Sequence, residues 1–248
     1  MTVRHDDLTV DWLGYATLRI EGADATVYFD PGRYGVLTGE WEPDPVCGAH
    51  PPTQDYTQQD GDLVCVTHIH HYDPDGIERV ASEDATVLIY EGIDVTETDR
   101  DVRPPSELPH DVVNVSDEAD LVANGLPVLT VPAYNHADGP NVLRDGTPIH
   151  PEGIGCGYLV SVEGTTVFWP GDSDVLDGHS ELDVSLFCPT IASNYTMDRH
   201  DAAELAESMD PDLVVPIHYN TFDGLKADDD AFAADVAGRG IPVALDSH

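Results

Sequence analysis

The sequence predicts an α/β protein in which two packed sheets carry helices on their outer sides. Many short apolar or alternating runs are bounded by turn residues, helical segments are few, and a strand–helix–strand pattern closes the chain. The predicted strands are Leu8–Leu13, Ala16–Glu21, Thr26–Phe29, Leu63–Val66, Thr86–Tyr90, Val128–Val131, Tyr158–Val162, Thr165–Trp169, Val184–Phe187 and Leu213–Ile217. Helices are predicted at Gly76–Ser82, Arg199–Met209 and Asp229–Ala237, with Asp198 as the N-cap of the second.

Length and composition indicate a single soluble domain over residues 1–248. The chain has 248 residues, 41% of them hydrophobic, and nothing in its middle resembles a linker. No apolar run approaches the length that a bilayer requires, and the N-terminus lacks a signal-peptide pattern. We therefore expect a cytoplasmic protein with no membrane partner; a homo-oligomer is compatible with the sequence.

The charge balance is extreme and extends along the whole chain. There are 48 Asp and Glu residues against 10 Lys and Arg residues, which gives a formal net charge of −38. Such self-repulsion is screened at molar salt, where the Debye length is short, so the composition indicates a salt-adapted protein from a halophile. No basic stripe could neutralise phosphates, which argues against nucleic acid as a partner or substrate.

The segment 67–76 carries the strongest functional signal. It places His68, His70, His71 and Asp73 directly behind the apolar run Leu63–Val66. Since side chains alternate along a strand, His68 and His70 are predicted to share one face and to bind one cation, whereas His71 is predicted to point the other way.

Further ligand-type residues follow other predicted strands. Asp172 comes after Thr165–Trp169, and His218 lies at the end of Leu213–Ile217. Imidazole and carboxylate ligands suit Zn, with Mn or Fe as alternatives, and one or two ions per chain. Asp30 could orient a ligating imidazole from behind. His136 or His150 could supply a further ligand.

Two long segments, residues 31–61 and 134–157, are rich in glycine and proline. Loops of this length inside a compact domain are usually functional, so both are predicted to border the active site, the first as a lid. Cys65 and Cys188 lie in apolar runs and are predicted to be buried, and the glycines around Cys156 indicate tight packing rather than a catalytic thiol.

These motifs together resemble the metallo-β-lactamase-fold hydrolases over nearly the whole chain. The resemblance rests on His68-x-His70, on Asp172 in Gly-Asp-Ser-Asp and on His218 in Pro-Ile-His-Tyr. Smaller motifs resemble the branch that contains the L-ascorbate-6-phosphate lactonases; they include Pro132-Ala133-Tyr134-Asn135, His150-Pro151 and Tyr195-Thr196-Met197-Asp198. The resemblance implies a four-layer αββα sandwich with a one- or two-metal site, in which Asp172 bridges the metals and a metal-bound water attacks the substrate.

The chain departs from the family pattern in the first motif. The family usually has Asp and His as the fifth and sixth residues of His-x-His-x-Asp-His, where this chain has Tyr72 and Asp73. Either Asp73 substitutes as a carboxylate ligand or the second metal is weakly held. Tyr15 also stands where the family usually has histidine. The His-Pro motif favours His150 over His136 as a ligand.

The leading hypothesis is a metal-dependent hydrolase of a small ester, lactone or phosphoester substrate. Asp73 or Asp172 would orient the attacking water or accept its proton, and Tyr195 or Tyr134 would polarise the oxyanion. The candidate phosphate-binding residues are Arg33, Arg144 and Arg199. The alternative is a non-catalytic metal-binding or ligand-sensing protein, which one bound ion without hydrolysis would indicate. A nuclease of the same fold is disfavoured by the charge.

Overall fold

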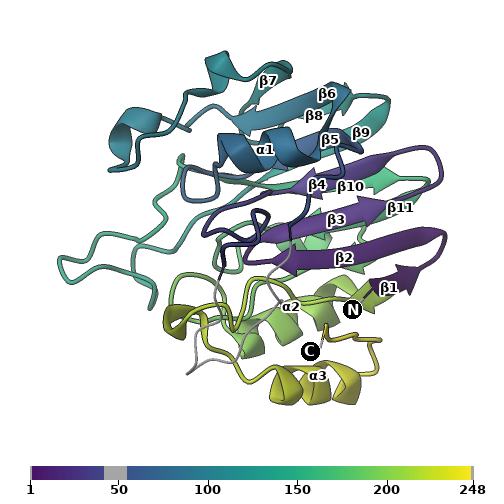
Figure 1. Cartoon of the computed structure of the whole chain (residues 1–248). Coiled ribbons are helices and arrows are strands. Elements are labelled where there is room, and N and C mark those ends of the chain that lie inside the picture. The colour runs from purple at the N-terminus through teal and green to yellow at the C-terminus, as the bar shows by residue number, and fades with distance from the viewer. Residues whose placement is uncertain (1, 42–54, 247–248) are drawn as a thin grey trace.

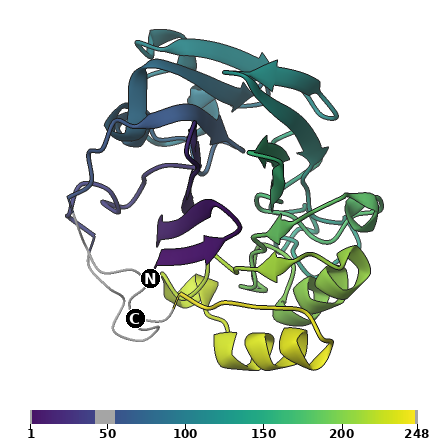
Figure 2. The same cartoon turned by 90° about the vertical axis from the view of Figure 1, so that its right-hand side faces the viewer.

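Two mixed sheets pack face to face in the computed structural model, which describes residues 2–41 and 55–246. The strand order is β1-β2-β3-β4-β5-β6-β7 in the first sheet and β13-β12-β11-β10-β9-β8 in the second. In Figure 2 the purple and blue N-terminal strands lie opposite the green strands. Helix α1 crosses in front of the first sheet in Figure 1, and α2 and α3 lie together at the bottom of the view, below the strands. This arrangement confirms the predicted fold class.

The strands of the first sheet are β1 (Thr2–His5), β2 (Leu8–Gly14), β3 (Thr17–Glu21), β4 (Thr26–Phe29), β5 (Gly61–Val66), β6 (Ala81–Tyr90) and β7 (Asp111–Val115). Those of the second are β8 (Asp120–Ala123), β9 (Leu126–Pro132), β10 (Cys156–Val162), β11 (Thr165–Trp169), β12 (Leu186–Phe187) and β13 (Leu213–Val214). The helices are α1 (Pro74–Val80), α2 (Arg199–Met209) and α3 (Asp229–Gly238).

Each sheet is antiparallel in one part and parallel in the other. Strands β4 to β7 run parallel, as do β11 to β13. Because the carboxyl ends of parallel strands meet at one edge, the loops that follow β4, β5, β11 and β13 come together there. The predicted ligands lie on the loops after β5, β11 and β13, except His150, which lies on the loop between β9 and β10.

The core joins the two sheets through large buried side chains. The rings of Phe29 in β4 and Tyr158 in β10 are 6.4 Å apart, and the Tyr158 hydroxyl donates a 3.1 Å hydrogen bond to the carbonyl oxygen of Val66 in β5. Cys65 and Cys188 are buried, as predicted. Burial raises the pKa of Cys156 well above its ordinary value, which argues against a thiolate nucleophile.

All the predicted strands are present, but three others were missed: β1, β7 and β8. Each forms an edge of its sheet, and each consists mainly of exposed and partly buried residues. Edge strands bury little apolar surface, so their sequences carry a weak strand signal.

The helix predictions were confirmed with one shift. Helix α2 has the predicted bounds, and Asp198 accepts hydrogen bonds from the backbone N–H groups of His200 and Asp201. Helix α1 begins earlier than predicted, with Pro74 in its first turn, and ends at Val80 because β6 starts at once. Residues 42–54, part of the predicted lid, lie outside the described residues. No helix within the described ranges is long and apolar enough to span a bilayer.

Candidate metal centre

The candidate site lies where several strands end. Thr67 and His68 directly follow β5, Asp30 directly follows β4, Asp172 follows β11, and His218 follows β13. Both Asp30 and His218 have left-handed backbones, with φ of 45° and 60°. Non-glycine residues held in this region are common at functional sites, because the surrounding fold must enforce the conformation.

The chain turns sharply at His68 instead of continuing as a strand. The backbone N–H groups of His71 and Tyr72 both donate to the carbonyl oxygen of His68, at 3.1 and 3.2 Å. Side-chain alternation requires a continuing strand, but β5 ends at Val66 and the chain turns after His68. The prediction that His71 points away from the site is therefore wrong: His71 Nε2 lies 3.7 Å from Asp172 Oδ2.

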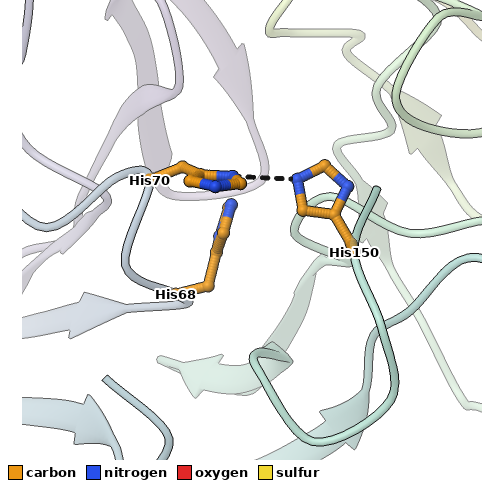
Figure 3. Close-up of side chains that lie close together, drawn as sticks. All are labelled: His68, His70 and His150. Atoms are coloured by element: carbon orange, nitrogen blue, oxygen red, sulfur yellow. Dashed lines mark hydrogen bonds between the residues drawn. The ribbon is translucent and has the colours of Figure 1, made fainter. Parts of the chain in front are cut away.

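Asp172 lies at the centre of the cluster that these loops form. Its Oδ2 lies 3.6 Å from His68 Nε2, 3.7 Å from His71 Nε2 and 3.4 Å from His150 Nε2, and its Oδ1 lies 3.3 Å from His218 Nε2. His70 joins through His150, with 3.1 Å between His70 Nδ1 and His150 Nε2. Figure 3 shows the rings of His68, His70 and His150 converging. The structure thus brings together every predicted ligand except Asp73, and adds His71.

The donor set fits a transition metal ion. A tetrahedral Zn site with bonds of 2.0–2.1 Å separates its ligand atoms by about 3.4 Å, close to the separations around Asp172. The buried atoms His68 Nε2, His71 Nε2 and Asp172 Oδ1 have no hydrogen-bond partner, an arrangement that is costly unless another group satisfies them. The potential ligands form two groups that share His68. The first group is His68, His70 and His150, and the second is His68, His71 and Asp172. Within each group the ligand atoms all lie within 4.8 Å of one another.

At His68, His70 and Asp172 the electrostatics favour the protonation states that bind metal. Burial lowers the pKa of His68 well below its ordinary value, and burial together with His150 lowers the pKa of His70 to about 4. Burial would raise the pKa of Asp172, but His71 and His218 outweigh it and hold that pKa well below the usual range. Neutral imidazoles and an ionised carboxylate are the forms that coordinate cations.

Asp30 supports the cluster from behind. It is almost fully buried, and its carboxylate accepts four hydrogen bonds: from Thr67 N and Thr67 Oγ1 at 2.8 Å each, from Trp169 Nε1 at 2.8 Å and from His71 Nδ1 at 2.9 Å. Burial lowers the pKa of His71, but Asp172 and Asp30 outweigh it and raise that pKa. Asp30 therefore fixes His71 with Nε2 facing Asp172, the arrangement expected behind a ligating imidazole.

Asp73 has a different position from the one predicted. Its Oδ1 caps α1 by accepting from the N–H groups of Asp75 and Gly76, at 3.1 and 3.2 Å, and its Oδ2 accepts from the N–H of Arg33 at 2.5 Å. Both carboxylate oxygens are thus engaged outside the cluster. The prediction of Asp73 as a metal ligand and catalytic residue is corrected: it is a helix cap that ties the loop after β4 to α1.

Replacing Asp73 with alanine is expected to lower the free energy of unfolding by roughly 1–2 kcal/mol, because the helix loses its cap, while metal content stays unchanged. Chemical denaturation and elemental analysis would measure the two effects. Asp75→Ala, in the exposed first turn of the same helix, is the matched control and should change stability by less than about 0.5 kcal/mol. Loss of metal from the Asp73 variant alone would restore Asp73 as a ligand.

The loop after β9 decides between the two alternative histidines. His136 is exposed, and its Nε2 lies 3.0 Å from the carbonyl oxygen of Val175. His150 is buried in the cluster, and its N–H donates to Asn135 Oδ1 at 2.9 Å. The structure therefore brings His150, and not His136, to the candidate centre.

A pocket of about 420 Å³ opens onto the cluster. His70, His150, Asp172 and His218 contribute to its base, and its walls include Tyr15, Arg33, Tyr34, Arg100, Tyr195 and Phe222. Of the residues predicted to contact substrate, Tyr195 and Arg33 line the pocket, while Tyr134, Arg144 and Arg199 do not. Arg100 was missed because it lies in a segment with no recognisable motif.

Comparisons with known proteins identify a family and several relatives. Residues 9–218 match the beta-lactamase superfamily domain. A UPF0173 metal-dependent hydrolase of Methanopyrus kandleri is 29% identical over 247 residues, which cover 95% of this chain and 94% of the relative. A second, from Thermococcus kodakarensis, is 26% identical and covers 95% of each chain.

The fold is shared with solved structures of differing chemistry. A metallo hydrolase from the hyperthermophilic archaeon Ignicoccus hospitalis aligns with a TM-score of 0.66 at 20% identity, covering 96% of this chain and 94% of the other. A diiron β-hydroxylase from Streptomyces venezuelae aligns with a TM-score of 0.63 at 16% identity, covering 99% and 53%. At these identities the likeness concerns the fold alone. Since the superfamily match extends over most of the residues, from β2 to His218, the chain belongs to the beta-lactamase superfamily.

Proposed function

We propose that the chain is a metal-dependent hydrolase that cleaves a small ester or lactone. One observation carries the proposal: a buried carboxylate, Asp172, is surrounded by four imidazoles within 3.3–3.7 Å at the base of an open pocket. The relatives named as metal-dependent hydrolases support it, because they cover nearly the whole chain. Proteins that share a fold act on different substrates, so the proposed substrate class rests on the residues that line the pocket.

The donor set suggests how the ions would be held. His68, His70 and His150 would hold one ion, and His71, Asp172 and His218 would hold a second, with Asp172 placed between the two groups. A bound ion would polarise the substrate carbonyl and lower the pKa of a coordinated water. Five imidazoles against one carboxylate favour Zn or Fe over Mn, and we propose Zn.

The chain's own residues would then orient the substrate and move the proton. With Asp73 capping α1, Asp172 is the carboxylate among the described residues that lines the pocket, and it would accept the proton of the attacking water. Burial and Asp172 raise the pKa of Tyr15 well above its ordinary value, so its hydroxyl stays protonated. Tyr15 would therefore donate a hydrogen bond to a developing oxyanion, and Tyr195, which lines the same pocket, is a second candidate donor.

The test pairs the two histidines of the loop after β9. Wild-type protein is expected to bind a transition metal and to hydrolyse at least one ester or lactone in a panel that also contains phosphodiesters. His150→Ala should lose metal and cut kcat/KM by roughly a hundredfold or more, whereas His136→Ala should retain both. Elemental analysis and steady-state kinetics would measure these changes.

Three results would overturn the proposal. If wild-type protein bound no transition metal, the proposed metal centre would be excluded. One tightly held ion with no hydrolysis across the panel would favour the alternative of a metal-binding sensor. Robust cleavage of RNA that depends on His68 would instead indicate a nuclease.

We also propose that the protein works at high ionic strength inside the cell. Its net charge of −38 supports this, because such self-repulsion is strongly screened only in concentrated salt.

A further inference from the structure

We propose that Arg33, assisted by Arg100, binds an anionic oxygen group on the substrate, a carboxylate or phosphate remote from the bond that is cleaved. The inference deepens the proposed hydrolase function and rests on it for the position of the scissile bond. Both arginines line the same pocket as His70 and Asp172. Their guanidinium groups are the cationic side chains among the described residues that face this pocket.

Arg33 and Arg100 line the pocket without an acidic partner among the described carboxylates. Four arginines form ion pairs with carboxylates: Arg19, Arg79, Arg103 and Arg239. Arg33 and Arg100 are half-buried, yet neither forms an ion pair with a described carboxylate, in a chain with 48 acidic residues. Among the described residues, their guanidinium N–H groups donate to backbone carbonyls and, for Arg100, to a threonine hydroxyl. A half-buried guanidinium without a counter-charge is a natural binding site for an anion.

Arg33 is held in place by an unusual backbone. Arg33 and Tyr34 both have left-handed φ, of 69° and 52°. The N–H of Arg33 is bound by Asp73, and Gly32 approaches Gly76 so closely that a Cβ on Gly76 would lie 2.8 Å from the Gly32 Cα. The loop is thus strained and fixed against α1, which is the pattern of a pre-organised binding residue.

The guanidinium of Arg33 lies beside His70, a candidate ligand, in the lining of the pocket. One Nη1 N–H donates to the carbonyl oxygen of His70, and the group stacks over the ring of Tyr34, 4.4 Å from its centre. No described residue accepts from its remaining N–H groups. These donors are therefore available to a ligand in the pocket, in the fork geometry that suits carboxylate and phosphate.

Arg100 provides a second positive charge beside the first. It donates to the carbonyl oxygens of Tyr72 and Ile69, at 2.8 and 2.5 Å. Burial and the nearby charge of Arg33 both lower its pKa. An anion bound between the two groups would relieve this repulsion, whereas a neutral ligand would not.

The rest of the pocket suits a small amphiphilic molecule. Asp172 is the acidic residue among those that line it, and in the proposed enzyme its charge is offset by metal. The rings of Tyr34 and Phe222 are 4.8 Å apart and form an apolar wall with Tyr15. We therefore expect a substrate with an anionic group at the arginines and an apolar body against these rings.

The test compares two esters of similar size and different charge. Mono-p-nitrophenyl glutarate carries a free carboxylate, and p-nitrophenyl valerate does not. We expect wild-type protein to prefer the glutarate ester. Arg33→Met should lower kcat/KM for the glutarate ester roughly ten- to hundredfold, chiefly through KM, and for the valerate ester less than about threefold. Arg33→Lys should recover part of the loss, and Arg144→Met, at an exposed position outside the pocket, should have no effect.

Two outcomes would overturn the inference: no preference of the wild type for the anionic ester, or equal losses on both esters in Arg33→Met, which would indicate a purely structural arginine. If neither ester is cleaved by metal-loaded wild type, the proposed hydrolase function fails for esters, and the inference is judged by binding instead. Calorimetry with succinate and with inorganic phosphate should then show binding that Arg33→Met weakens at least about tenfold. Whichever ion binds more tightly identifies the anionic group, and unchanged binding of both would refute the inference.

Discussion

Replacing Asp172 with asparagine is expected to remove bound metal and to lower hydrolysis on the order of a thousandfold or more. The substitution keeps the volume of the side chain but removes the negative charge that four imidazoles surround. Asparagine is a weaker ligand for a transition metal than a carboxylate, and it cannot accept the proton of an attacking water. Elemental analysis and kcat/KM on the best panel substrate would measure the two effects.

Asp177→Asn is the matched control, because Asp177 is exposed on the same loop. It should retain full metal content and activity. The thermal midpoint separates metal loss from misfolding: added Zn should raise the midpoint of wild type and of Asp177→Asn, but not that of Asp172→Asn. An Asp172→Asn protein that still bound a full complement of metal and responded to Zn would contradict the role given to this carboxylate.

The positions at strand ends were the most predictable part of the site. Asp172 and His218 follow buried strands, and a sheet with parallel strands brings such ends to one edge whatever the side chains are. The sequence pattern of buried strands was strong enough to identify both sites, although they lie far from His68 along the chain. For Asp172 and His218, the local sequence pattern and the sheet topology both predict a position at the candidate site.

The residues after His68 could not be placed in this way. Whether His71 or Asp73 faces the cluster depends on the turn that starts at His68, and that turn depends on two backbone hydrogen bonds to one carbonyl. The alternation rule fails where the strand stops. Asp73 fits two roles in the sequence: a carboxylate ligand near the histidines, and an N-cap directly before Pro74. The structure gives it the second role.

The choice between His136 and His150 depended on contacts across the loop. The N–H of His136 is held by Asp174 Oδ2 at 2.8 Å, and this backbone anchor leaves its side chain outside the cluster. The N–H of Asn135 donates to the carbonyl oxygen of His150 at 2.8 Å, which pins the other end of the loop. Such contacts join residues far apart in the loop, so residue type alone left both histidines open. The preference for His150, which came from the resemblance of its His-Pro motif, agrees with its position in the cluster.

Replacing Asp30 with alanine is expected to lower the free energy of unfolding by about 3–5 kcal/mol, because a buried charged acceptor is removed and its donors lose their partner. Thr67, His71 and Trp169 supply four hydrogen bonds to this carboxylate, and all three side chains are buried. Chemical denaturation at fixed high salt would measure the loss, with the indole of Trp169 as a local fluorescent probe.

The control is Asp62→Ala, which removes a carboxylate that accepts one backbone N–H, that of Thr26 in β4. Its cost should be about 1 kcal/mol, the contribution of a single hydrogen bond. The Asp30 variant should also bind metal roughly 10- to 100-fold more weakly, because His71 is no longer held with Nε2 toward Asp172. If both variants lost stability equally, or if metal affinity were unchanged in Asp30→Ala, then His71 would be positioned by packing alone and Asp30 would have no part in the metal centre.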